Sequence, residues 1–159
     1  IPNTVHRAAR VVGALGARYL TVHTAGGVPM VRAGVEGFRE GAAGAEGAEP
    51  TTLGVTVLTS EPEVTAHLLH QRVGVGLDGG CQGFVCSALD IAAVRQLAPS
   101  ALLVTPGIRP EGAPAEDQAR VATPRQALDA GADLLVVGRP VTQAEDPVAA
   151  ARALVASMA

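Results

Sequence analysis

Two short apolar runs decide the fold: Leu102-Leu103-Val104-Thr105-Pro106-Gly107-Ile108-Arg109-Pro110 and Asp133-Leu134-Leu135-Val136-Val137-Gly138-Arg139-Pro140. Each run is rich in Leu and Val and ends abruptly in Gly, Pro and Arg. Such a run is typical of a strand that is buried on both faces, with functional residues where the strand leaves the sheet. Two such ends lying side by side, each with an arginine, predict a pocket for a phosphate group.

The composition limits the classes of protein to which the chain can belong. The chain has 159 residues, is 48% hydrophobic and 2% aromatic, and carries a formal net charge of −3. It is long enough to bury one core, so we expect a single domain over residues 1–159, or part of one. No basic patch or aromatic platform indicates a nucleic acid partner. No apolar run approaches a membrane span, and the start resembles no signal peptide. We therefore expect a cytoplasmic protein that binds neither nucleic acid nor membrane.

Cysteine, histidine and lysine usage bears on cofactors and chemistry. Cys81 and Cys86 have no metal-ligand partners at useful spacing, and we expect both to be reduced and Cys86 to be buried. His67 and His70 lie three residues apart but lack a third ligand, so we predict a solvated helix face. We expect no metal site. Every positively charged side chain is an arginine, because the sequence contains no lysine.

Strand-like and helix-like segments alternate along the chain. Apolar spacing predicts a first helix over residues 3–15. Five strands are expected, at residues 19–23, 53–58, 83–87, 101–105 and 133–137. A helix follows each strand, at 28–42, from 60 to about 72, at 89–98, from 123 to 130 and from 146 onward. Ser60 is expected to cap the third of all these helices, with Pro62 in its first turn and Glu63 three residues after the cap.

This alternation predicts an α/β fold with parallel strands and right-handed crossovers. A doubly wound sheet and a TIM (β/α)8 barrel both fit the pattern. Polar and glycine-containing residues at the carboxyl ends of several strands favour the barrel. Five strands cannot close such a barrel, so either the sheet is open or the chain supplies about the last five βα units. The polar stretch 106–120 suits a mobile lid.

Seven short segments, in order along the chain, resemble successive motifs of the orotidine 5′-phosphate decarboxylase family. They are Ile1-Pro2-Asn3-Thr4-Val5, Val22-His23-Thr24-Ala25-Gly26-Gly27, Val55-Thr56-Val57-Leu58-Thr59-Ser60, Val85-Cys86-Ser87, Thr105-Pro106-Gly107-Ile108-Arg109, Asp117-Gln118-Ala119-Arg120 and Val137-Gly138-Arg139-Pro140-Val141-Thr142. Each motif alone is weak, but their shared order and spacing make the resemblance specific. It covers essentially the whole chain.

The resemblance implies a (β/α)8 barrel that forms a homodimer with active sites at the subunit interface. It implies conversion of orotidine 5′-monophosphate to UMP and carbon dioxide in pyrimidine biosynthesis, without metal or cofactor. Arg139 and the Gly138 amide would hold the substrate phosphate, which agrees with the rule that places phosphate sites after the last barrel strands. The alternative role for Arg139 is that of a surface arginine that forms a salt bridge.

The same resemblance implies further substrate contacts. Gln118 on the lid would reach the phosphate and the base when the loop closes, and Arg109 at the lid's root would be a further contact. Thr59, with Ser60 beside it, would recognise the pyrimidine. The alternatives are an ion pair with Glu111 or Glu116 for Arg109 and a backbone-bonded hydroxyl for Thr59.

Two residues of the first motif are implied to act on a neighbouring subunit. Ile1 and Thr4 match residues that, in this family, reach into the partner's site.

His23 ends a strand at the functional edge of the sheet. For this residue we favour the role of a structural, hydrogen-bonded histidine.

The catalytic signature of the family is absent from this sequence. That signature is an Asp-x-Lys-x-x-Asp run placed directly before Ile-Pro, and the sequence begins at Ile1. In the family the lysine gives a proton to the carbanion-like intermediate. Arginine does not release its proton at neutral pH, so no internal substitute exists. We expect no catalytic residue within residues 1–159. The alternatives are an inactive fragment that binds only nucleotide phosphate, or another phosphate-binding barrel decarboxylase that needs a metal.

The link between Thr59 and Gly83 is shorter than the family pattern. The difference is roughly eleven residues, or about three helical turns. A glycine-rich stretch over residues 74–80 lies where a second helix is expected. A deletion, or residues missing from the sequence, would each explain the difference.

Overall fold

The computed structural model describes residues 1–44, 49–61, 64–111 and 119–158. Its centre is one five-stranded sheet with the strand order β1-β2-β3-β4-β5. Every neighbouring pair of strands is parallel. The strands are β1 (Tyr19–His23), β2 (Thr51–Val55), β3 (Gly83–Val85), β4 (Leu102–Thr105) and β5 (Leu134–Leu135).

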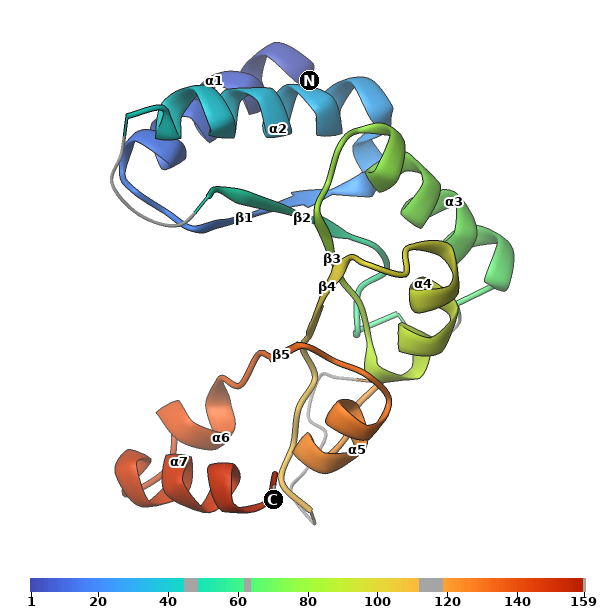
Figure 1. The fold of residues 1–159 in the computed structure, drawn as a ribbon. Coiled ribbons are helices and arrows are strands. Elements are labelled where there is room, and N and C mark those ends of the chain that lie inside the picture. The colour runs from blue at the N-terminus through green and yellow to red at the C-terminus, as the bar shows by residue number, and fades with distance from the viewer. Residues whose placement is uncertain (45–48, 62–63, 112–118, 159) are drawn as a thin grey trace.

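The strand order confirms a barrel-type sheet and shows that the doubly wound alternative is wrong. A doubly wound sheet reverses its strand order at a switch point, whereas here each strand pairs with the next one along the chain. Right-handed crossovers that always step in one direction place the connecting helices on one side of the sheet. Figure 1 shows the result: the sheet curves as an open arc with α1 to α5 along its outer side.

The helices follow the predicted alternation. They are α1 (Pro2–Ala14), α2 (Val28–Ala42), α3 (Ala66–Asp78), α4 (Ile91–Leu97), α5 (Pro124–Asp129), α6 (Arg139–Thr142) and α7 (Pro147–Ala156), with the 3₁₀ turns η1 (Thr24–Gly26) and η2 (Ala88–Asp90). The α5 start is a capping box between Thr123 and Gln126, and Gly16 follows the first helix at a φ of 76°, a backbone conformation that glycine adopts readily. The short helix α6 was not predicted.

The predicted start of the helix after β2 is wrong. Residues after β2 form a turn instead, in which the Glu61 N–H donates to the Leu58 carbonyl. Helix α3 begins at Ala66, and the Thr65 hydroxyl caps it by accepting from the Leu68 N–H at 3.2 Å. Thr65 thus supplies the acceptor that Ser60 was expected to supply. Pro62 and Glu63 lie outside the described residues. The helix also continues past residue 72 to Asp78.

Glycines let α1 and α2 pack at backbone distance. A Cβ at Gly37 would overlap the carbonyl oxygen of His6, and one at Gly41 would overlap that of Arg10. In the same way, a Cβ at Gly13 of α1 would overlap the Phe38 carbonyl oxygen of α2. Because the contacts advance together along both helices, α1 and α2 run parallel. Glycine weakens an isolated helix, so here packing outweighs propensity.

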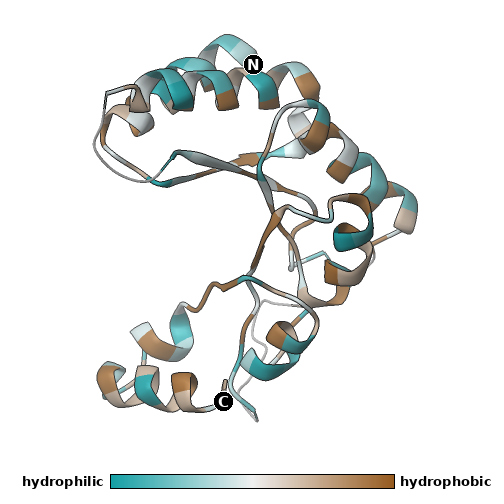
Figure 2. Cartoon of the chain, viewed as in Figure 1, coloured by the Kyte–Doolittle hydropathy of each residue, from teal (hydrophilic) through white to brown (hydrophobic). Residues whose placement is uncertain are grey.

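The main core lies between the sheet and α3, α4 and α5. Phe84, Ile91, Leu103 and Ile108 are fully buried in it. A smaller core around Val31 lies beneath α1 and α2. Figure 2 shows the hydrophobic residues concentrated along the central strands. Within the described ranges no helix is both long and apolar enough to cross a membrane.

Candidate functional site

The carboxyl ends of the strands meet at one edge of the sheet. The register aligns His23 with Val55, and Val55 with Val85. At the far side, the Val136 N–H donates to the Thr105 carbonyl at 2.9 Å, so β5 leaves the sheet beside β4. The two arginine-bearing strand ends that the sequence placed side by side are therefore neighbours in the fold.

Two backbone hydrogen bonds join the beginning and the end of the segment that follows β4. The Arg109 N–H donates to the Ala122 carbonyl at 2.9 Å, and the Ala122 N–H donates to the Gly107 carbonyl at 3.1 Å. Gly107 has a φ of 76°, and a Cβ there would lie 2.8 Å from the Arg120 carbonyl oxygen. Only glycine fits such a position without strain. Gln118, the predicted lid residue, lies outside the described residues.

Arg109 is buried beside these two hydrogen bonds. Arg109 as a whole is 8% exposed, and its guanidinium Nη1 donates to the Ile108 carbonyl at 2.9 Å. A guanidinium this buried requires hydrogen-bond partners and is therefore fixed in place.

Thr59 lies against the returning end of the same segment. Its carbonyl accepts from the Ala119 N–H at 3.1 Å and from the Arg120 N–H at 3.2 Å. Thr59 is buried, whereas Ser60 is exposed. The fold therefore brings Thr59 next to the residue that follows Gln118 in the sequence.

A buried ion pair at this edge was missed by the sequence reasoning. Arg120 donates through Nη1 to Asp90 Oδ2 at 2.6 Å and through Nη2 to Asp90 Oδ1 at 2.5 Å. The side chains are 9% and 7% exposed. Arg120 belongs to a motif that carried the family resemblance, but no pattern in the sequence pairs it with Asp90.

The cysteines are buried and free, which confirms the prediction for Cys86. Burial raises the pKa of the Cys86 thiol to about 12, with a further contribution from the nearby Asp90 carboxylate. Burial also raises the pKa of Cys81 to about 11. Both thiols are therefore protonated at neutral pH, and neither has the low pKa of a reactive cysteine.

Gly138 and Arg139 form the exit of β5. Gly138 is exposed and immediately precedes α6, and a Cβ there would meet nothing within 4 Å. Its carbonyl accepts from the Val141 and Thr142 N–H groups. Arg139 is the first residue of α6 and is half-buried. Open space therefore adjoins the backbone at the position predicted to hold a phosphate.

The remaining predicted residues are solvent-facing. Ile1 is 82% exposed, and Thr4, His23, His67 and His70 are exposed as well. The exposure of His67 and His70 confirms the solvated helix face. Across the described part of the chain, no group of three or more metal-ligating side chains comes together.

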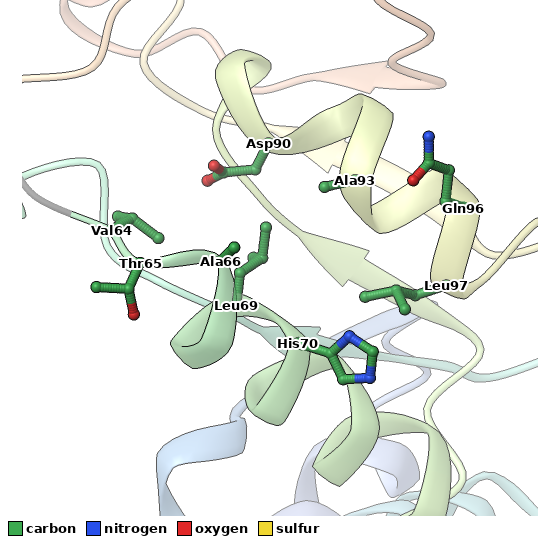
Figure 3. Close-up of a pocket in the computed structure, with 9 residues that line it drawn as sticks. All are labelled: Val64, Thr65, Ala66, Leu69, His70, Asp90, Ala93, Gln96 and Leu97. Atoms are coloured by element: carbon green, nitrogen blue, oxygen red, sulfur yellow. The ribbon is translucent and has the colours of Figure 1, made fainter.

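One pocket lies apart from the β5 exit. It has a volume of about 330 Å³ and is situated between α3 and α4. Figure 3 shows Asp90 toward the left of the pocket, with Gln96 and His70 on the right. Gly138 and Arg139 do not line it, so it is separate from the predicted phosphate position.

A comparison with protein families shows to which family the chain belongs. The profile of the orotidine 5′-phosphate decarboxylase / HUMPS family matches residues 1–154. The chain belongs to this family.

Relatives within the family agree with that assignment. The chain is 48% identical to an orotidine 5′-phosphate decarboxylase of Anaeromyxobacter sp. (strain K), over 99% of this chain and 71% of the relative. It is 46% identical to that of Thermobifida fusca, over 99% of this chain and 69% of the relative. The crystal structure of orotidine 5′-phosphate decarboxylase from Lactobacillus acidophilus superposes with a TM-score of 0.81 at 32% identity, covering 99% of this chain and 70% of that one.

The lengths of these relatives bear on two predictions. The chain spans about 70% of each relative, as expected for about five of eight βα units. The alignment with the Anaeromyxobacter protein spans 171 positions, against 159 residues in this chain. That relative therefore has at least 12 residues inside the aligned region that this chain lacks. This difference agrees in size with the shortened link expected between Thr59 and Gly83.

Proposed function

We propose that residues 1–159 form the phosphate- and base-binding side of an orotidine 5′-monophosphate decarboxylase site, and that an Asp/Lys array outside these residues supplies the proton. The observation that carries the proposal is the adjacency of two strand ends. Gly138 and Arg139 leave the sheet beside the strand that leads to Arg109. Family membership supplies the substrate class.

The phosphate end of the substrate would be held by Gly138 and Arg139. Backbone amides and guanidinium groups both donate strong hydrogen bonds to phosphate oxygens. Gln118 would add a contact from the segment after β4. Binding energy gathered at the phosphate, remote from the reacting carbon, would stabilise the transition state for loss of the carboxylate.

The pyrimidine end would be held by Thr59 and Ser60, with Arg109 as a further substrate contact. Loss of carbon dioxide leaves a carbanion-like centre at the ring, which needs a proton. Residues 1–159 contain no lysine to provide that proton. The 159-residue chain alone is therefore proposed to be inactive, while the intact protein is a decarboxylase that uses neither metal nor cofactor.

The proposed assembly is a cytoplasmic homodimer with shared sites. Ile1 is 82% exposed and lies at the start of α1. Together with the exposed Thr4, it is free of the chain's own core and available to a second subunit. These features support the role that the family resemblance implies for both residues.

The test is decarboxylation of orotidine 5′-monophosphate in the presence of EDTA. Two proteins are compared: the 159-residue chain, and the same chain preceded by the amino-terminal segment of the Anaeromyxobacter relative. We expect the extended protein to release carbon dioxide and the short chain to release none. Activity that requires a divalent metal would favour the metal-dependent barrel decarboxylase instead. Inactivity of both proteins, with UMP binding retained, would favour a fragment that only binds nucleotide phosphate.

Single substitutions in the extended protein test the phosphate site. Arg139→Ala removes a charge-assisted contact and should lower kcat/KM by about 10- to 100-fold. Arg152→Ala is the matched control, because Arg152 is an exposed arginine on α7. Equal effects of the two substitutions would refute the role of Arg139.

A further inference from the structure

Three strand-end loops meet at the buried pair of Asp90 and Arg120. Asp90 is the last residue of η2, which follows β3. Arg120 lies in the connection that runs from the end of β4 to the start of α5. Thr59 follows β2 and accepts hydrogen bonds from the backbone of Ala119 and Arg120. One residue, Arg120, therefore contacts both other loops: its side chain binds Asp90 and its backbone binds Thr59.

Asp90 is a rigid anchor for this arrangement. Its N–H donates to the Ser87 carbonyl at 2.9 Å, and the fully buried Ser87 caps the same turn by accepting from the Leu89 N–H at 3.1 Å. The two parallel hydrogen bonds to Arg120 fix the guanidinium plane as well as its distance. Fixing the guanidinium restrains the backbone of Arg120, and with it the peptide that holds the Thr59 carbonyl.

Burial distinguishes this pair from the other ion pairs of the described residues. The Arg95–Asp133 side chains are 33% and 43% exposed, and they lie at the amino ends of β4 and β5. The Arg125–Asp129 pair is more exposed still. Burying an ion pair carries a desolvation penalty that often cancels its attraction, so such a pair is a weak source of stability and a strong constraint on geometry.

We propose that Asp90 and Arg120 are positioning residues for the pyrimidine end of the site, acting by holding Thr59 in place. The inference rests on the proposed substrate contact of Thr59. Asp90 and Arg120 need not touch the substrate. Their loss should weaken recognition of the base and leave the phosphate contacts at Gly138 and Arg139 unchanged, because those contacts come from a different strand end.

The experiment separates the base from the phosphate by using two ligands, UMP and ribose 5-phosphate. Affinities are measured by calorimetry for the unaltered protein and for Arg120→Lys, which keeps the charge but cannot form two parallel hydrogen bonds. Asp90→Asn is the second variant. Arg95→Lys is the matched control, because it makes the same substitution in the ion pair at the opposite edge of the sheet. Amide hydrogen exchange at residues 119 and 120 is followed in each protein.

For Arg120→Lys we expect UMP affinity to fall by about tenfold and ribose 5-phosphate affinity by less than about twofold. Protection of the Ala119 and Arg120 amides should fall in parallel, whereas Arg95→Lys should change neither. Unchanged UMP affinity, or equal losses for both ligands, would overturn the proposal.

The exchange measurement keeps this inference distinct from the proposed function. If the unaltered protein binds neither ligand, the proposed function fails. In that case, retained protection at residues 119 and 120 in Arg120→Lys overturns the positioning role too, and lost protection supports the restraint on Thr59. Should Asp90→Asn fail to fold, Arg120→Lys still decides the outcome.

Discussion

Replacing Gly41 with alanine tests the close packing of α1 on α2. In an isolated helix the change from glycine to alanine is favourable by about 1 kcal/mol. In this fold the new Cβ would overlap the Arg10 carbonyl oxygen, and it would lie 2.7 Å from the Arg10 carbonyl carbon and 3.0 Å from the Ala14 nitrogen. These are all backbone atoms, which cannot rotate away. The two helices must therefore separate.

The magnitude follows from two opposing effects. Overpacking of a well-packed interface costs about 1–3 kcal/mol, and the rigid backbone contact places Gly41→Ala toward the upper end. After the gain in helix propensity, we expect a net loss of about 1–2 kcal/mol. In a protein of this size that loss lowers Tm by about 2–8 °C.

Gly74→Ala is the matched control. Gly74 lies inside α3, and a Cβ there would meet nothing within 4 Å. This variant should be more stable than the unaltered protein by about 0.5–1 kcal/mol. Urea unfolding followed by circular dichroism compares the two variants. If Gly41→Ala proves as stable as Gly74→Ala, α1 does not pack on α2 at backbone distance, and the position of α1 against α2 is refuted.

Three further predictions concern single buried or paired groups. The Thr105 Oγ1 is fully buried and makes no hydrogen bond to any residue that the structure describes, so Thr105→Val should raise the free energy of unfolding by about 1 kcal/mol, and a lower Tm would contradict this. Burial tends to raise the pKa of Asp133, but hydrogen bonds from Leu103 and Arg95 outweigh it and hold that pKa below its usual value. The carboxylate therefore stabilises the fold above the ordinary aspartate pKa of about 3.9, and this contribution is lost as the pH falls further. Asp133→Ala should be less stable by about 1 kcal/mol at pH 7, with a difference that shrinks in urea titrations at and below about pH 4; a difference independent of pH would contradict the assignment. Because its pKa is about 12, Cys86 should react with iodoacetamide at pH 8 more than about a hundredfold more slowly than after unfolding in urea; rapid labelling of the folded protein would contradict its burial.

Much of the architecture could be predicted because strand signals in this sequence are local. Each apolar run stops at Gly, Pro or a hydroxyl residue, so five strands and their parallel pairing were expected. The strand ends were less accurate. β2 begins at Thr51 and ends at Val55, because the residues after Val55 turn into the loop that carries Thr59.

One error shows where local signals compete. Ser60 with Glu63 mimics a helix start, but the turn from Leu58 to Glu61 and the better-placed Thr65 determine where α3 begins. The helix over residues 28–42 was predicted correctly, but the close approach of α1 to its Gly37 and Gly41 is a tertiary contact that the sequence pattern does not report.

The candidate site was predicted only in part, because several of its contacts are tertiary. Arg109, Gly138 and Arg139 were proposed as site residues from their places at strand ends and from the family resemblance, and their roles stay predictions. Asp90 and Arg120 are thirty positions apart in the sequence, and their pairing depends on how β3 and β4 lie side by side. No periodicity or motif reports such a contact.

Titration of the protein with UMP and with uridine tests the central claim most directly. The two ligands differ only in the phosphate, so the ratio of their dissociation constants isolates the proposed site at Gly138 and Arg139. We predict that UMP binds at least about 100-fold more tightly than uridine, and that Arg139→Ala removes most of this difference. Equal affinity for UMP and uridine, or a preference for UMP that survives Arg139→Ala, would contradict the account.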